Sequence, residues 1–268
     1  MKYKIIVLDL DGTLTNSKKE ISTPTLEALL DIQQKGYKVI LASGRPTPGI
    51  VKLGNELQLN KFGGYILSYN GAKIINCQTN ETIFQKTLPI DVIPYLYETA
   101  VSFNVGIISY DEGKVIVGRE IDKYIELEGK INNIKLQKVN DFVGYLNYPV
   151  NKCLMTGEHE VLLEVQKKLK KKYNSLLSIY FSEPFFLEIM PQNVDKAQSL
   201  LTLLNTIGVS SEFYFGVEEY DFELAGYQIR KFDDIDTFEA VENFSGKIND
   251  FEGLPDKVIH YPINLNSF

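Results

Sequence analysis

Two aspartates lie two residues apart, directly after a short apolar run near the start of the chain. The segment Asp9–Thr13 reads Asp-Leu-Asp-Gly-Thr, and the preceding residues Lys4–Leu8 have the pattern of a buried strand. Gly12 allows the backbone to curl, so both carboxylates can face one ligand. A solvated turn is the plain alternative, but a buried strand leads into this segment. The pattern therefore indicates a site that binds or reacts with a ligand.

A calcium-binding loop is a second interpretation of the same residues. Asp9, Asp11, Thr13 and Glu20 fall at positions 1, 3, 5 and 12 of an EF-hand loop. That loop needs glycine at position 6, where Leu14 stands, and it follows a helix rather than a strand. The sequence therefore argues against an EF-hand.

A strand–helix–strand unit would position the aspartates. A helix is predicted to begin near Thr23, which can cap its first turn, and to end at Gly36. A second apolar strand follows over residues 38–42 and ends at Ser43. Elements in this order favour a parallel sheet with a right-handed crossover. Reactive groups in such sheets lie at the carboxyl ends of strands, so we expect Asp9 and Ser43 at one site.

The middle of the chain has a different pattern. Apolar strand pairs separated by turn residues recur there, at 105–118 and at 177–190. Helix patterns alternate with these pairs, and the lysine-rich run at 167–172 is typical of a solvated helix C-terminus. We therefore predict that residues 83–190 form an inserted α+β unit with an antiparallel sheet.

The α/β pattern of the first part of the chain returns after Pro191. Apolar residues at helical spacing predict a helix over Ala197–Leu204, and Gly208 is expected to end it. The predicted organisation is therefore an α/β core made of residues 1–82 and 191–268, interrupted by the inserted unit.

Composition excludes several classes of function. The 268 residues carry 28 Lys and Arg against 35 Asp and Glu, and this net charge of -7 disfavours nucleic-acid binding. Cys77 and Cys153 have no metal-ligand spacing and cannot form a disulfide scaffold. Asp9 interrupts the first apolar run, which argues against a signal peptide, and no stretch approaches the roughly 18 apolar residues of a membrane span. We expect a soluble, cytoplasmic protein.

Several segments, in this order along the chain, resemble motifs of the haloacid dehalogenase (HAD) superfamily in its Cof-type sugar-phosphatase branch. They are Asp9–Leu14, Ala42–Pro46, Asn70–Ala72, Leu187–Pro191 and Val194–Lys196. The resemblance covers residues 1 to about 204 and implies a Rossmann-like core with a parallel sheet. It also implies that residues 83–190 are the branch's large α/β cap, which decides substrate specificity.

The resemblance implies a mechanism for phosphate transfer. Asp9 would be the nucleophile that forms an aspartyl-phosphate, and Asp11 would protonate the leaving alcohol and later activate water. Ser43 would hydrogen-bond the transferring phosphoryl group, and Lys196 would balance its charge. Mg²⁺, held by the Asp9 carboxylate and the Asp11 backbone carbonyl, would neutralise more of that charge.

Further residues of these motifs are candidate substrate-binding groups. Together with Ser43 they are Thr13, Gly44, Arg45 and Asn70, all of which belong to matched motifs. The implied ligand is a small phosphorylated metabolite, most simply a sugar phosphate.

The fourth motif departs from the family. The branch carries Gly-Asp-x-x-Asn-Asp there, and its first Asp completes the magnesium shell; in this chain Val217 takes its place and Tyr220 replaces the Asn. Valine has no oxygen to offer a hard cation. Asp221 stands in register and is our candidate for the third metal ligand. Glu218, which directly follows Val217, is the alternative. Residues 227–268 carry none of the family's usual features.

Three functions follow from this mixture of intact and altered motifs. The leading interpretation is a Mg²⁺-dependent phosphatase that works through an aspartyl-phosphate. The alternative is a catalytically weakened or inactive HAD-like protein that binds phosphosugars or acts in regulation, because Val217 replaces a metal-binding Asp. A phosphosugar mutase is the third.

Aromatic residues in the insertion are expected in the core more often than in contact with substrate. They are Tyr110, Tyr180, Phe181, Phe185 and Phe186. Arg119 could contact an anion or serve the structure. Movement of the insertion is expected about linkers near 82–88 and 190–193.

Overall fold

The computed structural model describes residues 4–208, except 12, 17 and 112, together with 258–260. These residues form two compact units. The first contains residues up to 44, 50–84, 196–208 and 258–260, and the second contains 45–49 and 85–195.

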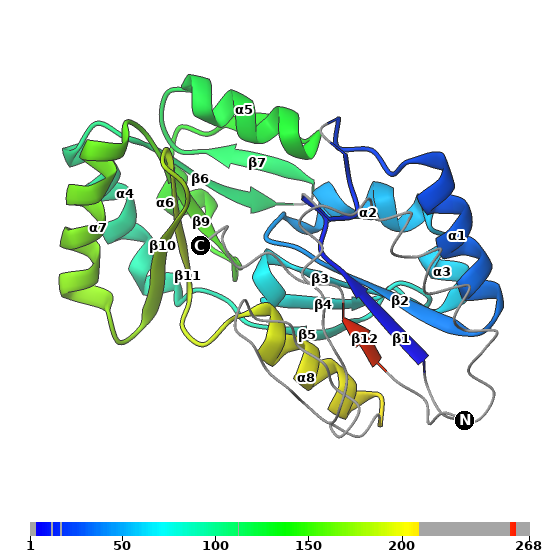
Figure 1. Ribbon diagram of the computed structural model, residues 1–268. Helices are drawn as coiled ribbons and strands as arrows, with labels where there is room; N and C mark the ends of the chain where they lie inside the picture. Colours follow the sequence, from blue (N-terminus) through cyan, green and yellow to red (C-terminus); the bar gives the residue numbers. More distant parts are fainter. Residues whose placement is uncertain (1–3, 12, 17, 112, 209–257, 261–268) are drawn as a thin grey trace. The chain divides into compact units, whose positions relative to one another are not determined.

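A six-stranded sheet forms the centre of the first unit, in the order β12-β1-β2-β3-β4-β5 (Figure 1). Its strands are β1 (Lys4–Leu8), β2 (Tyr37–Ala42), β3 (Tyr65–Ser68), β4 (Lys73–Asn76), β5 (Thr82–Gln85) and β12 (Val258–His260). The pairs β1–β12, β1–β2 and β2–β3 are parallel, which confirms the predicted parallel sheet. Strand β4 runs antiparallel to β3, because the short connection between them can only form a hairpin.

Helices cover both faces of this sheet. They are α1 (Thr23–Gln34), α2 (Thr47–Glu56), α3 (Leu59–Phe62) and α8 (Lys196–Thr206), and the short 3-10 turn η1 (Tyr69–Gly71) follows β3. Side chains of β1 alternate between the faces: Ile6 and Leu8 pack in the cluster that contains α1 and α2, whereas Ile5 and Val7 pack against α8. Both faces are therefore buried, as the uninterrupted apolar run of β1 predicts.

The ends of α1 are set by local chemistry. The N-cap is Ser22, whose side chain accepts a hydrogen bond from the Thr25 backbone N–H, so the prediction that Thr23 caps the helix is wrong by one residue. Pro24 then occupies the first turn, where its missing N–H leaves no helical bond unmade. Gly36 has φ of 91°, in the left-handed region that follows many helices, and confirms the predicted end.

A second six-stranded sheet lies in the other unit, in the order β10-β11-β9-β6-β7-β8. Its strands are β6 (Gly106–Asp111), β7 (Lys114–Val117), β8 (Lys135–Lys138), β9 (Cys153–Thr156), β10 (Leu177–Glu183) and β11 (Phe186–Pro191). The predicted hairpins β6–β7 and β10–β11 are both antiparallel. Strand β8 pairs parallel to β7, because a helix connects the two, so the sheet is mixed rather than wholly antiparallel.

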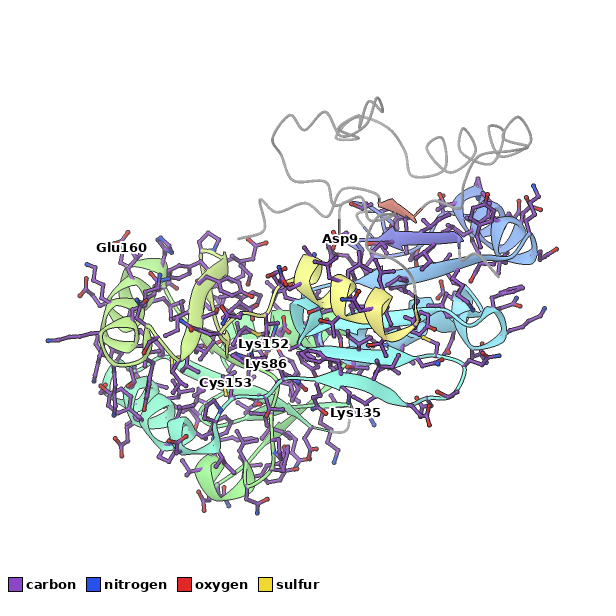
Figure 2. All side chains as sticks on the ribbon, turned by 90° about the horizontal axis from the view of Figure 1, so that it is seen from below. Asp9, Lys86, Lys135, Lys152, Cys153 and Glu160 are labelled. Atoms are coloured by element: carbon purple, nitrogen blue, oxygen red, sulfur yellow. The ribbon has the colours of Figure 1, made fainter. Side chains whose placement is uncertain are left out.

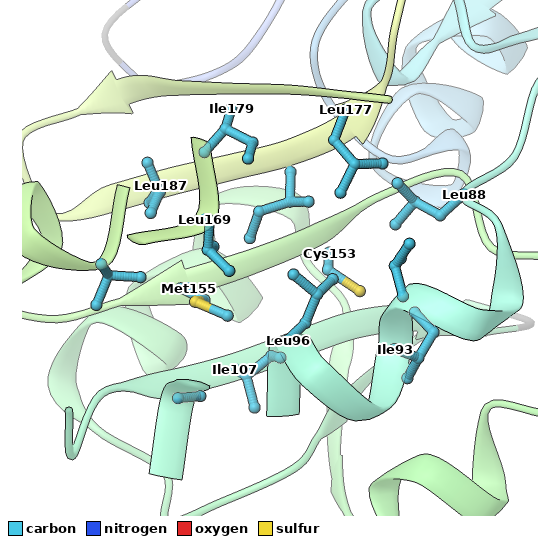
Figure 3. Close-up of a cluster of buried hydrophobic side chains, with 14 of the residues drawn as sticks. Leu88, Ile93, Leu96, Ile107, Cys153, Met155, Leu169, Leu177, Ile179 and Leu187 are labelled. Atoms are coloured by element: carbon cyan, nitrogen blue, oxygen red, sulfur yellow. The ribbon is translucent and has the colours of Figure 1, made fainter. Parts of the chain in front are cut away.

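Three helices of the second unit contribute to one apolar core. They are α4 (Ile93–Ser102), α6 (Phe142–Tyr145) and α7 (His159–Tyr173), with the short 3-10 turn η2 (Ile90–Val92) before α4. Helix α5 (Lys123–Asn132) lies outside this cluster and connects β7 to β8. Figure 3 shows side chains of the strands, such as Ile107 and Leu187, with Leu96 of α4 and Leu169 of α7 in one cluster. Three lysines occupy the last turn of α7, as predicted for the 167–172 run. In the part of the chain that is described, no helix has the length and apolarity needed to cross a bilayer.

One pair of substitutions in α4 tests this core. Leu96 is fully buried, whereas Val101 of the same helix is 47% exposed. Leu96→Ala should lower the free energy of unfolding by about 2–5 kcal/mol, because it leaves a cavity. Val101→Ala should change it by less than about 0.5 kcal/mol. Urea unfolding followed by circular dichroism measures both, and equal losses would contradict this assignment of the core.

Candidate active site

Asp9 follows β1 directly, at the carboxyl end of the strand (Figure 2). The residue is 5% exposed, and its Oδ1 accepts a hydrogen bond from Lys196 Nζ at 2.7 Å. Lys196 is 6% exposed and is the first residue of α8. Two groups separated by 187 positions in the sequence therefore form a buried ion pair.

Helix α8 is held beside the 3-10 turn η1. The Ser199 hydroxyl donates a hydrogen bond to the Gly71 carbonyl at 2.9 Å, and Leu200, Leu203 and Leu204 pack on the sheet. These contacts fix the first turn of the helix, and with it the backbone from which the Lys196 side chain extends.

Burial controls the protonation of Asp9. Removal from water raises the pKa of the Asp9 carboxyl above its ordinary value, and the ion pair with Lys196 opposes this shift. The nearby Asp11 carboxylate raises the pKa further. Because the pKa of Asp9 is raised overall, the Lys196 ammonium group offsets only part of the free-energy cost of burying the Asp9 carboxylate.

Asp11 lies in a less buried environment two residues further on. It forms an isolated bridge with Thr15, whose hydroxyl donates to the Leu10 carbonyl at 2.8 Å. The Asp11 side chain is 40% exposed, and its Oδ1 lies 2.7 Å from Lys19 Nζ. The two carboxylates of this segment thus have different neighbours and different access to water.

In the first unit, Ser43 and Gly44 of the second matched segment lie beside Asn70 of the third. The Ser43 N–H donates to the Leu67 carbonyl at 2.9 Å, and the Asn70 N–H donates to the Ser43 carbonyl at 3.0 Å. A Cβ atom at Gly44 would lie 3.0 Å from Asn70 Oδ1, so this close approach favours glycine. The structure therefore brings Ser43, Gly44 and Asn70 together after β2 and β3.

Thr13 and Arg45 are the two remaining candidates for substrate contact. The Thr13 N–H donates to the Leu10 carbonyl at 3.4 Å, within the loop after β1. Arg45 groups with the second unit, where its Nη1 donates to the Gly49 carbonyl at 3.5 Å. Arg45 is 8% exposed.

Only some of the predicted magnesium ligands belong to the described residues. Within the described ranges, no three His, Cys, Asp or Glu side chains gather as a metal-binding group. Asp9 and Asp11 are present, but Asp221, Val217, Glu218 and Tyr220 lie outside the described residues. So do Gly12 and almost all of the 227–268 segment.

Residues of the insertion that were considered for substrate contact have structural partners. The Tyr110 hydroxyl donates to Glu128 Oε1 at 2.6 Å, and burial raises the pKa of that carboxyl. Arg119 donates from Nη1 to the carbonyls of Ala100 and Val105, each at 2.9 Å, near the end of α4. Its guanidinium therefore serves the structural role rather than an anion contact.

Three more of these aromatic residues also pack against neighbours. Phe181 lies against the core of the second unit, Phe186 is buried, and Phe185 stacks on Tyr124 with ring centroids 4.8 Å apart. Large aromatic surfaces favour such burial, as the sequence predicts.

Sequence reasoning missed Lys19, which pairs with Asp11. The signal was weak, because a lysine in a polar segment is most often solvated. Lys196, the buried partner of Asp9, could be predicted because it belongs to the matched motif Val194–Lys196.

Comparisons with known proteins agree with these motifs. A family model described as haloacid dehalogenase-like hydrolase matches residues 6–224. A haloacid dehalogenase-like hydrolase from Bacteroides thetaiotaomicron is 46% identical, with a TM-score of 0.76 over 78% of this chain and 79% of its own. YxeH of Bacillus subtilis (strain 168), described as a phosphatase, is 27% identical over 210 residues, or 77% of each chain. The sugar phosphatase BT4131 shares the fold at 21% identity, with a TM-score of 0.65 over 78% of each chain.

Removal of one partner tests the buried pair. Lys196→Met should lower the free energy of unfolding at pH 7 by about 3–5 kcal/mol, because Asp9 would remain buried without a cation. Asp9→Asn in the same chain should restore part of this loss, since a neutral amide needs no counter-charge. Thermal and urea unfolding measure both variants.

Lys35→Met is the matched control, because Lys35 forms an exposed ion pair with Asp31 at 2.8 Å. Its effect on stability should be small. If Lys196→Met proved no more harmful than this control, the pair would not be buried in solution.

Proposed function

Because the chain belongs to the haloacid dehalogenase-like hydrolases, we propose that it is a phosphatase that releases inorganic phosphate from a small phosphorylated metabolite. The observation that carries this proposal is the buried pair of Asp9 and Lys196, 2.7 Å apart. It sets a carboxylate nucleophile beside an ammonium group that can balance the charge of a phosphoryl group. The likeness to YxeH, described as a phosphatase, supports the same class of reaction.

A sugar phosphate is the substrate class that we propose. The support is the resemblance of the motifs to the Cof-type branch, since the 21% likeness to BT4131 speaks for the fold alone. We assign selection of the sugar to the inserted unit, predicted at residues 83–190, with movement about the linkers near 82–88 and 190–193.

The first half of the reaction transfers the phosphoryl group to the protein. A carboxylate oxygen of Asp9 attacks phosphorus in line with the leaving oxygen, so one P–O bond forms while the other breaks. Asp11 gives its proton to the leaving oxygen, and the sugar departs as a neutral alcohol. The product is an aspartyl-phosphate on Asp9 and a deprotonated Asp11.

The second half regenerates the enzyme. Asp11 takes a proton from a water molecule as the water oxygen attacks phosphorus, and the bond between phosphorus and the Asp9 oxygen breaks. Inorganic phosphate leaves, and both aspartates return to their starting states. Lys196 offsets negative charge throughout, and Ser43 donates a hydrogen bond to the phosphoryl oxygens. Thr13, Gly44, Arg45 and Asn70 are our further candidates for substrate contacts.

The residues fit a magnesium ion. Mg²⁺ takes oxygen ligands from one or two carboxylates together with phosphate oxygens, and the Asp9 carboxylate and Asp11 carbonyl supply oxygens of this kind. The upward pKa direction of Asp9 is consistent with a carboxylate whose charge Lys196 only partly offsets. Asp221, or Glu218, is our proposed third ligand. When bound, the ion would neutralise part of the charge on the transferring phosphoryl group.

Phosphate release from a panel of hexose and pentose phosphates tests the proposal. Release should require Mg²⁺, and excess chelator should abolish it. Asp9→Asn should lower the rate by at least about a thousandfold, because the nucleophile is lost. Isomerised product without phosphate would favour a mutase, and no release by the folded protein would favour a phosphosugar-binding role.

Substitution of Val217 tests whether the chain is a fully active enzyme or one weakened by a missing metal ligand. Val217→Asp should lower the Mg²⁺ concentration for half-maximal rate by about tenfold if this position adjoins the metal, because it adds a charged oxygen ligand. Val217→Leu is the matched control, which changes shape without adding oxygen. An unchanged metal requirement in Val217→Asp would mean that other residues already complete the shell.

A further inference from the structure

Lys19 has an unusual backbone conformation for its residue type. Its φ is 62°, in the left-handed region that residues other than glycine, asparagine and aspartate rarely adopt. Such conformations are unfavourable and persist only where the surrounding structure enforces them. The positive φ of Lys19 therefore raises the question of which function the conformation serves.

Hydrogen bonds to Asn16 enforce this conformation. The side-chain Oδ1 of Asn16 accepts from the backbone N–H groups of Lys18 and Glu20, at 2.9 Å and 3.2 Å. The Asn16 carbonyl accepts from the Lys19 N–H at 2.9 Å, and the Asn16 N–H donates to the Glu20 carbonyl at 3.0 Å. Four bonds therefore close a tight turn around Lys19.

The turn directs Lys19 back to the loop that follows β1. Lys19 Nζ donates to Asp11 Oδ1 at 2.7 Å, and the two side chains are 42% and 40% exposed. An ion pair with this exposure adds little to stability. Stability therefore gives no sufficient reason to hold a lysine in an unfavourable backbone conformation opposite this aspartate.

We propose that Lys19 is a positioning residue that holds the Asp11 carboxyl group in one orientation for proton transfer to and from the reacting oxygens. The inference rests on the proposed phosphatase function. One oxygen of Asp11 is fixed by the ammonium group, so the plane of the carboxyl group can no longer turn freely. Alignment of a catalytic group in this way raises the rate without any new contact to substrate.

The choice of leaving group makes the role measurable. A sugar alkoxide is a poor leaving group, so breakage of its bond to phosphorus depends on the proton that Asp11 supplies. The leaving group of p-nitrophenyl phosphate is stable as an anion and needs no such proton. A defect in Asp11 orientation should therefore slow the sugar phosphate far more than the nitrophenyl ester.

Three variants form the experiment, each assayed with a hexose phosphate and with p-nitrophenyl phosphate. Lys19→Ala should lower kcat for the hexose phosphate about tenfold, with KM changed less than about twofold, and should lower kcat for the nitrophenyl ester less than about threefold. Lys19→Arg should recover most of the hexose phosphate rate, since it retains the cation. Lys35→Ala, which breaks the exposed pair with Asp31, should leave both rates unchanged.

The outcomes separate this inference from the function on which it rests. A Lys19→Ala protein that behaves like Lys35→Ala, or one that slows both substrates equally, would overturn the positioning role while the phosphatase stands. A wild-type protein with no activity on either ester would overturn both. Thermal melting of each variant, expected within a few degrees of wild type, shows that the rates report folded protein.

Discussion

The ion pair between Asp9 and Lys196 is the constraint on which the first unit depends. Both groups are almost fully buried, so neither could remain charged there at tolerable free energy without the other. The pair joins the first strand to α8, which the chain reaches only after the whole insertion. Assembly of the first unit therefore requires residues from both sides of the insertion, and the Asp9 carboxylate reaches its buried, paired form only once they meet.

The sheet explains how such distant residues can meet. Strands β1, β2 and β3 are parallel neighbours, so the residues that follow them emerge at one edge. The backbone hydrogen bonds of Ser43 with Leu67 and with Asn70 link the loop after β2 to the end of β3 and the turn that follows it. Helix α8 reaches the same loops through Ser199 and Gly71. These backbone and side-chain bonds connect the loops of the first unit to one another.

Sequence patterns predicted the features that repeat or that use distinctive residues. Strand β1, the helix end at Gly36 and the two antiparallel hairpins follow from apolar periodicity and turn chemistry. The parallel strand β8 was missed, because strand direction depends on the connecting helix rather than on the strand itself. The cap of α1 was placed one residue late, since Ser22 and Thr23 can both cap and only the backbone geometry distinguishes them. In the site, the pairing of Lys19 with Asp11 has only a weak sequence signal, because a lysine in a polar segment is most often solvated.

The environments of the two aspartates suit the unequal roles proposed for them. Asp9 is buried against Lys196, so its nucleophilic oxygen is held in place and shielded from competing water. Asp11 is exposed enough to exchange protons with water, as an acid and base that must be reset in each cycle. Exposure, however, also allows a side chain to rotate. A cation held by a constrained turn can restore orientation without restoring burial, and this combination is what the contact between Lys19 and Asp11 provides.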